Sequence, residues 1–209
     1  MSTFARLVVA CSVAAALAPT AQAAPVTAQD CLAAQQRSAG TACRGIARCY
    51  AKAMRTGSAL SPACLDKARA TMGALFTEVE AAANCLVKGQ AQGVGDQLVM
   101  GLDDVATSLT LAGGRCAGGK MAGLGKACSG FFRCNAAADA DSTTLDPSCI
   151  AVHAAKVTDG FTKLEGRGQC ATTGDASTLE GKVANLVDAV HVVLRGTGTT
   201  TTSSTATTN

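Results

Sequence analysis

Apolar side chains recur at steps of three and four positions along much of the chain, which is the period of an amphipathic helix. The first clear stripe consists of Leu65, Ala68, Met72, Leu75, Phe76 and Val79. A second stripe consists of Leu98, Leu102, Val105 and Leu109. Near the end of the chain, a third consists of Leu179, Val183, Leu186, Val187, Val190 and Leu194. The pattern predicts a predominantly helical protein.

Polar residues and prolines mark where these helices start. Ser61 and Asp146 each stand directly before a proline, which is the order of an N-cap and a first helical residue. Residues 177–180 have the sequence Ser-Thr-Leu-Glu of a capping box, so we expect the last helix to start there. Residues 28–55 are rich in alanine and contain few helix breakers, which predicts a long first helix.

The cysteines reveal an internal duplication. Ten of them form two sets with the same successive spacings of 12, 6, 15 and 21 residues. The sets are Cys31, Cys43, Cys49, Cys64 and Cys85, then Cys116, Cys128, Cys134, Cys149 and Cys170. One offset of 85 residues relates the two sets, and it also maps Arg48 onto Arg133 and Glu80 onto Glu165. Four equal intervals indicate that one unit was copied in tandem.

The duplication predicts an all-α fold of two tandem pseudo-symmetric units, residues 24–112 and 113–195. Each unit is expected to be a disulfide-linked helical hairpin with a third helix. The weak point is the first helix of the second unit, because each glycine in a helix costs about 1 kcal/mol relative to alanine. Its glycines are Gly118, Gly119, Gly123, Gly125 and Gly130. We expect this helix to be broken or partly a loop, and we expect residues 196–209, rich in Thr and Ser, to be a disordered tail.

The first 23 residues have the pattern of an export signal. Arg6 is followed by an apolar run over residues 7–18, and Ala21-Gln22-Ala23 fits the site of signal peptidase. The run is shorter than the roughly 20 residues of a membrane span, so we expect cleavage and no transmembrane segment. The alternative is a lipoprotein box that ends at Cys11, but almost no apolar run precedes this cysteine. The protein is therefore expected in the periplasm or outside the cell.

Composition agrees with an exported, disulfide-bonded chain. Ten cysteines behind a signal are typical of an oxidising compartment. Aromatic residues make up only 3% of the chain, so the apolar core is thin and cross-links are needed to stabilise it. Loss of Arg6 with the signal leaves 17 basic and 15 acidic residues. This small excess, without a Lys/Arg cluster among aromatics, predicts no binding of nucleic acid or anionic membranes.

Helical phase predicts which cysteines pair within a unit. Cys31 and Cys49 are five turns apart on one helix face, about 27 Å along the axis. An antiparallel hairpin brings Cys49 near Cys64 and Cys31 near Cys85, and loops of 15 and 54 residues closed in this way contribute about 3 and 4 kcal/mol. The corresponding bonds in the second unit are Cys116–Cys170 and Cys134–Cys149.

One cysteine in each unit has no partner inside the unit, because five is an odd number. These are Cys43 and Cys128, and we expect them to join each other across a pseudo-two-fold axis. The alternatives are two free thiols or a cross-link to a second chain.

Candidate catalytic and metal-binding residues are few. His153 and His191 with Asp188 offer ligand types for a metal, but the first unit has alanine in place of both histidines. Residues 114–120 have the spacing of a phosphate-binding loop, yet Met121 follows where Ser or Thr should hold magnesium, and no strand precedes them. We therefore predict no metal site and no cofactor.

The cysteines and the remaining charged residues have structural explanations. No two cysteines are close enough for a redox or zinc motif. The carboxylates Asp103, Asp104, Asp139 and Asp141 are expected on solvated helix faces or at caps. Arg48 and its counterpart Arg133 are expected in structural ion pairs or near helix ends. We predict no catalytic residues, and hence no enzyme.

Two stretches resemble a known family. Residues 42–68, with Ala42-Cys43-Arg44 and Leu60-Ser61-Pro62-Ala63-Cys64-Leu65-Asp66-Lys67-Ala68, and residues 168–176, Gly-Gln-Cys-Ala-Thr-Thr-Gly-Asp-Ala, are similar to bacterial exported proteins built of cysteine- and alanine-rich helical repeats. The first unit departs from the family's closing motif after Cys85. The resemblance implies an exported repeat protein and no particular activity.

Three functional hypotheses follow. The leading one is a non-enzymatic, exported structural or interaction protein at the envelope or outside the cell. The first alternative is a carrier of a small apolar ligand or lipid, with Phe76 and Phe161 lining a cavity rather than filling the core. The second is a secreted inhibitor or effector that binds another protein through the turn at residues 55–58.

Overall fold

The computed structural model describes residues 27–109 and 114–196, so the expected signal peptide and residues 197–209 of the expected tail lie outside it. All regular structure in the described ranges is α-helical, which confirms the all-α prediction. The helices are α1 (Ala28–Thr56), α2 (Pro62–Ala82), α3 (Ala91–Ser108), α4 (Gly114–Ala140), α5 (Pro147–Glu165) and α6 (Ala176–Leu194). The described helices include none that is long and apolar enough to cross a membrane.

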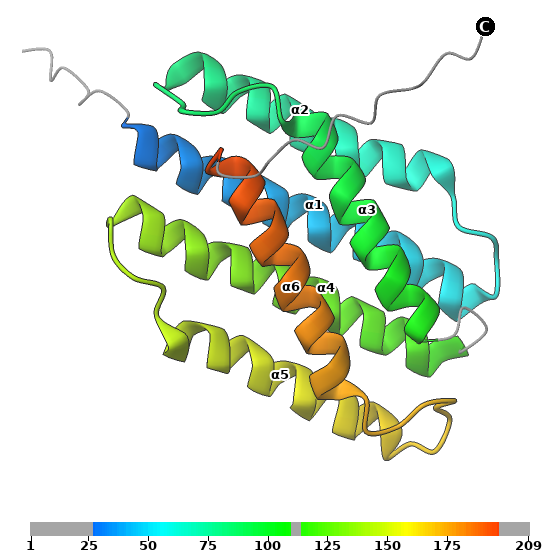
Figure 1. Ribbon diagram of the computed structural model, residues 1–209. Coiled ribbons are helices and arrows are strands. Elements are labelled where there is room, and N and C mark those ends of the chain that lie inside the picture. Colours follow the sequence, from blue (N-terminus) through cyan, green and yellow to red (C-terminus); the bar gives the residue numbers. More distant parts are fainter. Residues whose placement is uncertain (1–26, 110–113, 197–209) are drawn as a thin grey trace, which may run out of the picture.

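Helices α1 and α4 lie side by side in the centre of the molecule (Figure 1). Helix α2 packs along the outer side of α1, and α5 along the outer side of α4. Helices α3 and α6 lie obliquely across one face of the central pair. Each copy of the sequence unit therefore supplies one central, one outer and one crossing helix. That a two-fold axis relates the copies stays a prediction.

The start signals of α2 and α5 act as expected. Ser61 accepts a hydrogen bond from the backbone N–H of Cys64 at 3.4 Å, and Asp146 accepts one from that of Ser148 at 2.8 Å. The expected start of the last helix was wrong, because α6 begins at Ala176 instead of after a Ser177 cap. Its N-cap residue is Asp175, whose carboxylate binds other residues and leaves the helix end without a side-chain cap.

The prediction that glycines break the first helix of the second unit was also wrong, since α4 is continuous. A Cβ atom on Gly118 would lie 2.7 Å from the carbonyl oxygen of Ala51, and one on Gly125 would overlap the Cβ of Ala47. These glycines thus let the backbones of α1 and α4 approach closely. The packing gained along this contact offsets the low helix propensity of glycine.

The apolar stripes predicted from the sequence form the core. Their most buried members on α3 and α6 face the central pair, and Phe76 and Phe161 of the outer helices are 1% and 2% exposed. Both phenylalanines belong to the continuous apolar core, which they fill. The turn at residues 55–58 is exposed as expected, with Gly57 in the left-handed conformation that ends α1.

Five disulfides connect the helices. Cys43–Cys128 joins the middle of α1 to the middle of α4, with 6.3 Å between the Cα atoms. The other four connect the central helices to the start of each outer helix and to the segment that follows it. They are Cys31–Cys85, Cys49–Cys64, Cys116–Cys170 and Cys134–Cys149. These are the same five pairs that helical phase and parity predict, and among the described helices only α3 and α6 have no disulfide.

Close packing of α1 on α4 can be tested with two alanine substitutions in the same helix. Gly125→Ala should lower the free energy of unfolding by about 1–3 kcal/mol, because its Cβ overlaps that of Ala47. Gly123→Ala is the matched control, since a Cβ there meets nothing within 4 Å. It should raise stability by up to about 1 kcal/mol through helix propensity. Chemical denaturation of the oxidised protein measures both, and a stabilising Gly125→Ala would contradict the packing.

Candidate functional site

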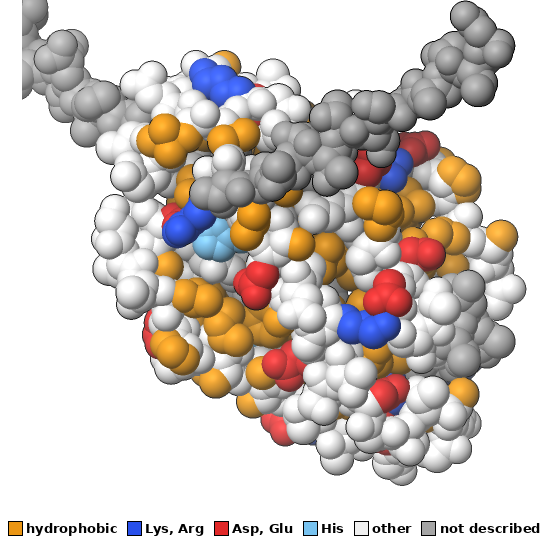
Figure 2. Space-filling view, viewed as in Figure 1, with side chains coloured by type: hydrophobic (Ala, Val, Ile, Leu, Met, Phe, Trp, Pro, Cys, Tyr) orange, Lys and Arg blue, Asp and Glu red, His pale blue; other side chains and the backbone are white. Residues whose placement is uncertain are grey.

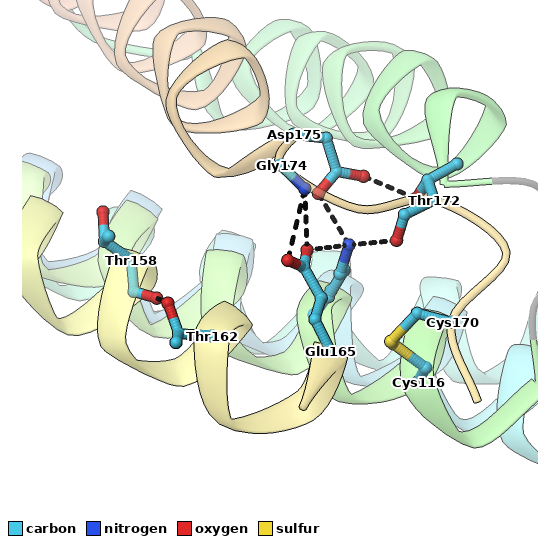
Figure 3. Close-up of polar contacts among 9 residues, drawn as sticks. Cys116, Thr158, Thr162, Glu165, Cys170, Thr172, Gly174 and Asp175 are labelled. Atoms are coloured by element: carbon cyan, nitrogen blue, oxygen red, sulfur yellow. Dashed lines mark hydrogen bonds and ion pairs between the residues drawn. A yellow bond between two sulfur atoms is a disulfide. The ribbon is translucent and has the colours of Figure 1, made fainter. Parts of the chain in front are cut away.

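A buried lysine on α4 is the first polar site of the molecule (Figure 3). Lys120 is 1% exposed, and its Nζ lies 2.6 Å from both Glu165 Oε1 and Asp175 Oδ1. The same ammonium donates to the carbonyl oxygen of Thr172 at 2.8 Å. Glu165 also accepts from the backbone N–H of Gly174 at 3.2 Å. All three donors of the ammonium are therefore used, and the cluster fixes the loop between α5 and α6.

The first unit contains the same contacts with different charges. Gln35 stands where Lys120 stands, and its Nε2 donates to Glu80 Oε1 at 3.0 Å and to the Val87 carbonyl at 3.1 Å. Glu80 accepts from the backbone N–H of Gly89 at 3.0 Å. Each of these partners precedes its counterpart by 85 residues. Gln90 takes the place of Asp175.

The two clusters contain different charged groups. In the second unit, one lysine is set against two carboxylates, whereas in the first unit the carboxylate of Glu80 accepts from neutral Gln35. Burial acts to raise the pKa of Asp175, but hydrogen bonds from Lys120 and Thr172 and the charge of Lys120 outweigh it and hold the pKa below its ordinary value. Asp175 therefore stays ionised at neutral pH and balances the buried lysine. A structural role for both clusters follows.

The lysine belongs to the stretch with the spacing of a phosphate-binding loop. In the structure, residues 114–120 form the first two turns of α4, not a loop, and the ammonium of Lys120 is occupied by carboxylates. The recurrence of Glu80 at Glu165 was the sequence signal for the cluster. It did not identify Lys120, because the matching residue in the first unit is a glutamine.

A second polar cluster surrounds Asp139 near the end of α4. Asp139 is only 5% exposed and accepts hydrogen bonds from Gln36 of α1 and Arg195 after α6. His191 Nε2 lies 3.1 Å from Asp139 Oδ2. The expectation of a solvated Asp139 was therefore wrong, because helices α1 and α6 cover it. Burial lowers the pKa of His191 and prevails over the opposing charge of Asp139, which favours the neutral imidazole.

Beside this cluster lies a hollow of about 410 Å³. Its apolar lining comes from α1, α6 and the segment after α2, and its polar lining includes Asp139 and Arg195. Leu86 lines the hollow and is 80% exposed, the largest value among the exposed large hydrophobic residues of the described chain. The remaining apolar lining residues include Leu32, Val87 and Leu194. This position differs from the one expected for a carrier, because Phe76 and Phe161 take no part.

The two histidines lie in different surroundings. His153 of α5 sits over Gly130, with its ring 6.3 Å from that of Phe131 in an edge-on arrangement. Its nitrogen and the sulfurs of Cys134 and Cys149 lie within 4.8 Å of one another. Those sulfurs are bonded to each other, so they offer no thiolate to a metal. Within the described residues, His153, His191 and Asp188 form no group of metal ligands.

The two matched arginines also differ from expectation. Arg48 and Arg133 are exposed, lie in the interior of their helices, and form no ion pair with any described residue. The expected structural ion pair or helix-end role was therefore wrong. Both side chains line one further hollow, between the central helices and α2.

Comparisons with known proteins assign this chain to no family. No protein-family model, no curated protein and no solved structure matches this chain. The resemblance to exported cysteine-rich repeat proteins therefore stays a prediction, and the functional argument depends on the geometry alone.

The charge balance around Lys120 predicts a non-additive pair of substitutions. Lys120→Gln should destabilise the protein by about 3 kcal/mol or more, because it leaves Glu165 and Asp175 as neighbouring, partly buried anions. Adding Asp175→Gln recreates the residue set of the first unit and should restore much of the loss. Denaturation of both single variants and the double variant measures the coupling. Equal losses in Lys120→Gln and in the double variant would contradict the charge-balance argument.

Proposed function

We propose that the chain is an exported, non-catalytic interaction protein whose helices form a rigid, disulfide-linked support for binding surfaces. The observation that carries this proposal is the set of five disulfides, which hold four of the six described helices. Such density of cross-links is typical of an oxidising compartment, since cytosolic reductants keep thiols reduced. The signal-like N-terminus supports a periplasmic or extracellular location.

The buried ionisable groups support a non-catalytic role. Lys120 is saturated by two carboxylates and a carbonyl, and Asp139 is buried and accepts hydrogen bonds from Gln36 of α1 and Arg195 after α6. A general acid or base must have a free site within reach of a substrate. The side chains of Lys120 and Asp139 instead form hydrogen bonds that hold helices and loops in place.

A second candidate function is carriage of a small apolar ligand. The hollow beside Leu86 favours it, because about 410 Å³ lies within the size of small-molecule sites and its wall combines apolar side chains with a buried carboxylate. The ligand would have an apolar body and one polar group directed to Arg195, whose side chain is half exposed.

The leading function predicts that binding depends on the cross-links. Immobilised oxidised protein should retain macromolecules from envelope extracts or culture supernatant, and the same chain after reduction and alkylation should retain none of them. Quantitative mass spectrometry of the two eluates makes the comparison. Turnover in a hydrolase or oxidoreductase panel that is lost on substitution of a named polar residue would overturn the non-catalytic proposal.

The carrier function predicts a ligand that survives purification. Native mass spectrometry of protein from its own compartment should then show an added mass, which Leu86→Glu removes by placing a charge in the apolar wall. Met100→Glu is the control, because Met100 is exposed on α3, away from this hollow. Absence of an added mass in the unmodified protein, together with no uptake of apolar dyes, would dismiss the carrier.

A further inference from the structure

The exposed side of α1 is almost entirely basic. Exposed or half-buried positions recur along it at steps of three and four residues, so they share one face of the helix. Between residues 37 and 55, five of the six residues in this row are cations, and the sixth is Thr41. Ala34 and Asp30 continue the row toward the start of the helix. The cations are Arg37, Arg44, Arg48, Lys52 and Arg55.

Helix α4 adds three cations on the corresponding side, namely Arg115, Lys126 and Arg133, all exposed. At 3.6 residues per turn, they lie about 160–180° around the helix from buried Asn135. Tyr50 is the counterpart of Asn135 in α1, and the α1 cations lie about 120–160° around the helix from it. Tyr50 is directed to α3, because its hydroxyl donates to Asp103 at 3.0 Å.

These eight cations form one surface, which we call the basic face. It lies on the side of the central pair opposite to α3 and α6. Figure 2 views the other side, where acidic side chains are spread among apolar ones. The small net charge of the chain therefore conceals a segregation of positive charge.

Among the described residues of the central pair, Asp30 alone offsets a charge of the basic face, through its interaction with Arg37 at the end of the row. Asp30 is the only acid of α1 and lies in its first turn, and Asp139 is the only acid of α4 and is buried. None of the eight cations forms an ion pair inside the described ranges. Eight unpaired cations on two adjacent helices repel one another, and this repulsion is relieved when an anion binds.

A hollow of about 530 Å³ lies in the basic face between α1, α2 and α4. Arg44, Arg48, Lys67 and Arg133 supply its charged lining, and no carboxylate lines it. Hydroxyl groups complete the lining from Thr41, Thr71 and Ser129. The Nε of Arg44 is buried without a hydrogen-bond partner in the described part of the chain, and the half-buried Arg44 side chain lines the hollow.

The chemistry of this lining favours phosphate. Six of the eight cations are arginines, whose planar guanidinium donates two parallel hydrogen bonds to a phosphate group. The cations of α1 are separated by rises of about 4.5 to 10.5 Å and span about 27 Å, which suits a linear ligand with many charges. Neither central helix carries an exposed large apolar side chain, and no aromatic side chain is exposed there for base stacking or membrane insertion.

We propose that the basic face binds a linear, phosphate-rich polyanion without nucleobases, with one phosphate group seated in the hollow between Arg44, Arg48 and Arg133. The second unit has no equivalent phosphate-binding site, because Ser129 replaces Arg44 and the ring of His153 occupies the place of Ala68. One chain therefore has a single preferred anchor point along an extended positive surface.

The test uses the oxidised mature protein and linear polyphosphate of about 30 units, with binding followed by calorimetry at two salt concentrations. Arg48→Gln with Arg133→Gln should weaken binding about tenfold or more, since each loses a charge-assisted contact. Arg69→Gln with Lys182→Gln is the matched control, because it removes the same charge from residues paired with Asp96 and Asp104 of α3. The control should change affinity less than about twofold. Circular dichroism checks that both double variants fold.

Binding of further ligands shows which chemical groups the basic face recognises. Inorganic phosphate should compete only at high concentration, because it occupies the hollow alone. Polyglutamate of equal charge should bind at least about tenfold more weakly than polyphosphate, since it lacks phosphate groups. Equal affinity for polyglutamate, equal losses in the two double variants, or tighter binding to duplex DNA, heparin or anionic vesicles than to polyphosphate would each overturn the proposal.

Discussion

The close contact between α1 and α4 is the constraint on which the rest of the structure depends. The two backbones approach along a seam where glycine and alanine replace larger side chains, and Cys43–Cys128 closes this seam near its middle. Each other helix packs on at least one member of this pair. A thin core is sufficient under these conditions, because the two longest helices form a continuous base that needs few bulky residues.

The two sequence units form matching contacts with different residues. Gln35 and Lys120 make the same two contacts, to a glutamate carboxylate and to a loop carbonyl, although one side chain is neutral and the other charged. The lysine is tolerated at 1% exposure because Asp175 accompanies it, whereas Gln90 needs no charge to balance Gln35. The contact is thus retained, and its electrostatics are adjusted by paired substitutions.

Properties set by local geometry were predictable from the sequence, and properties set by contacts between distant segments were not. Apolar periodicity located the helices, and the phase of Cys31 and Cys49 on one helix gave their partners. The continuity of α4 could not be predicted, because Gly125 is favourable only when Ala47 lies opposite to it. The burial of Asp139 likewise depends on Gln36 and His191, which are distant in sequence. The basic face was missed because net charge sums over all sides of the molecule.

The disulfides and the basic face act in opposite directions on the free energy of folding. Helices α3 and α6 cover one side of the central pair, and eight unpaired cations on the other side oppose folding by mutual repulsion. A small apolar core offsets such repulsion poorly, but a disulfide acts largely on the unfolded chain and is insensitive to surface charge. Cys49–Cys64 lies beside the cationic row of α1, in the lining of the hollow. The cross-links therefore allow this surface to remain positively charged and uncovered, which is the state in which it is able to bind an anion.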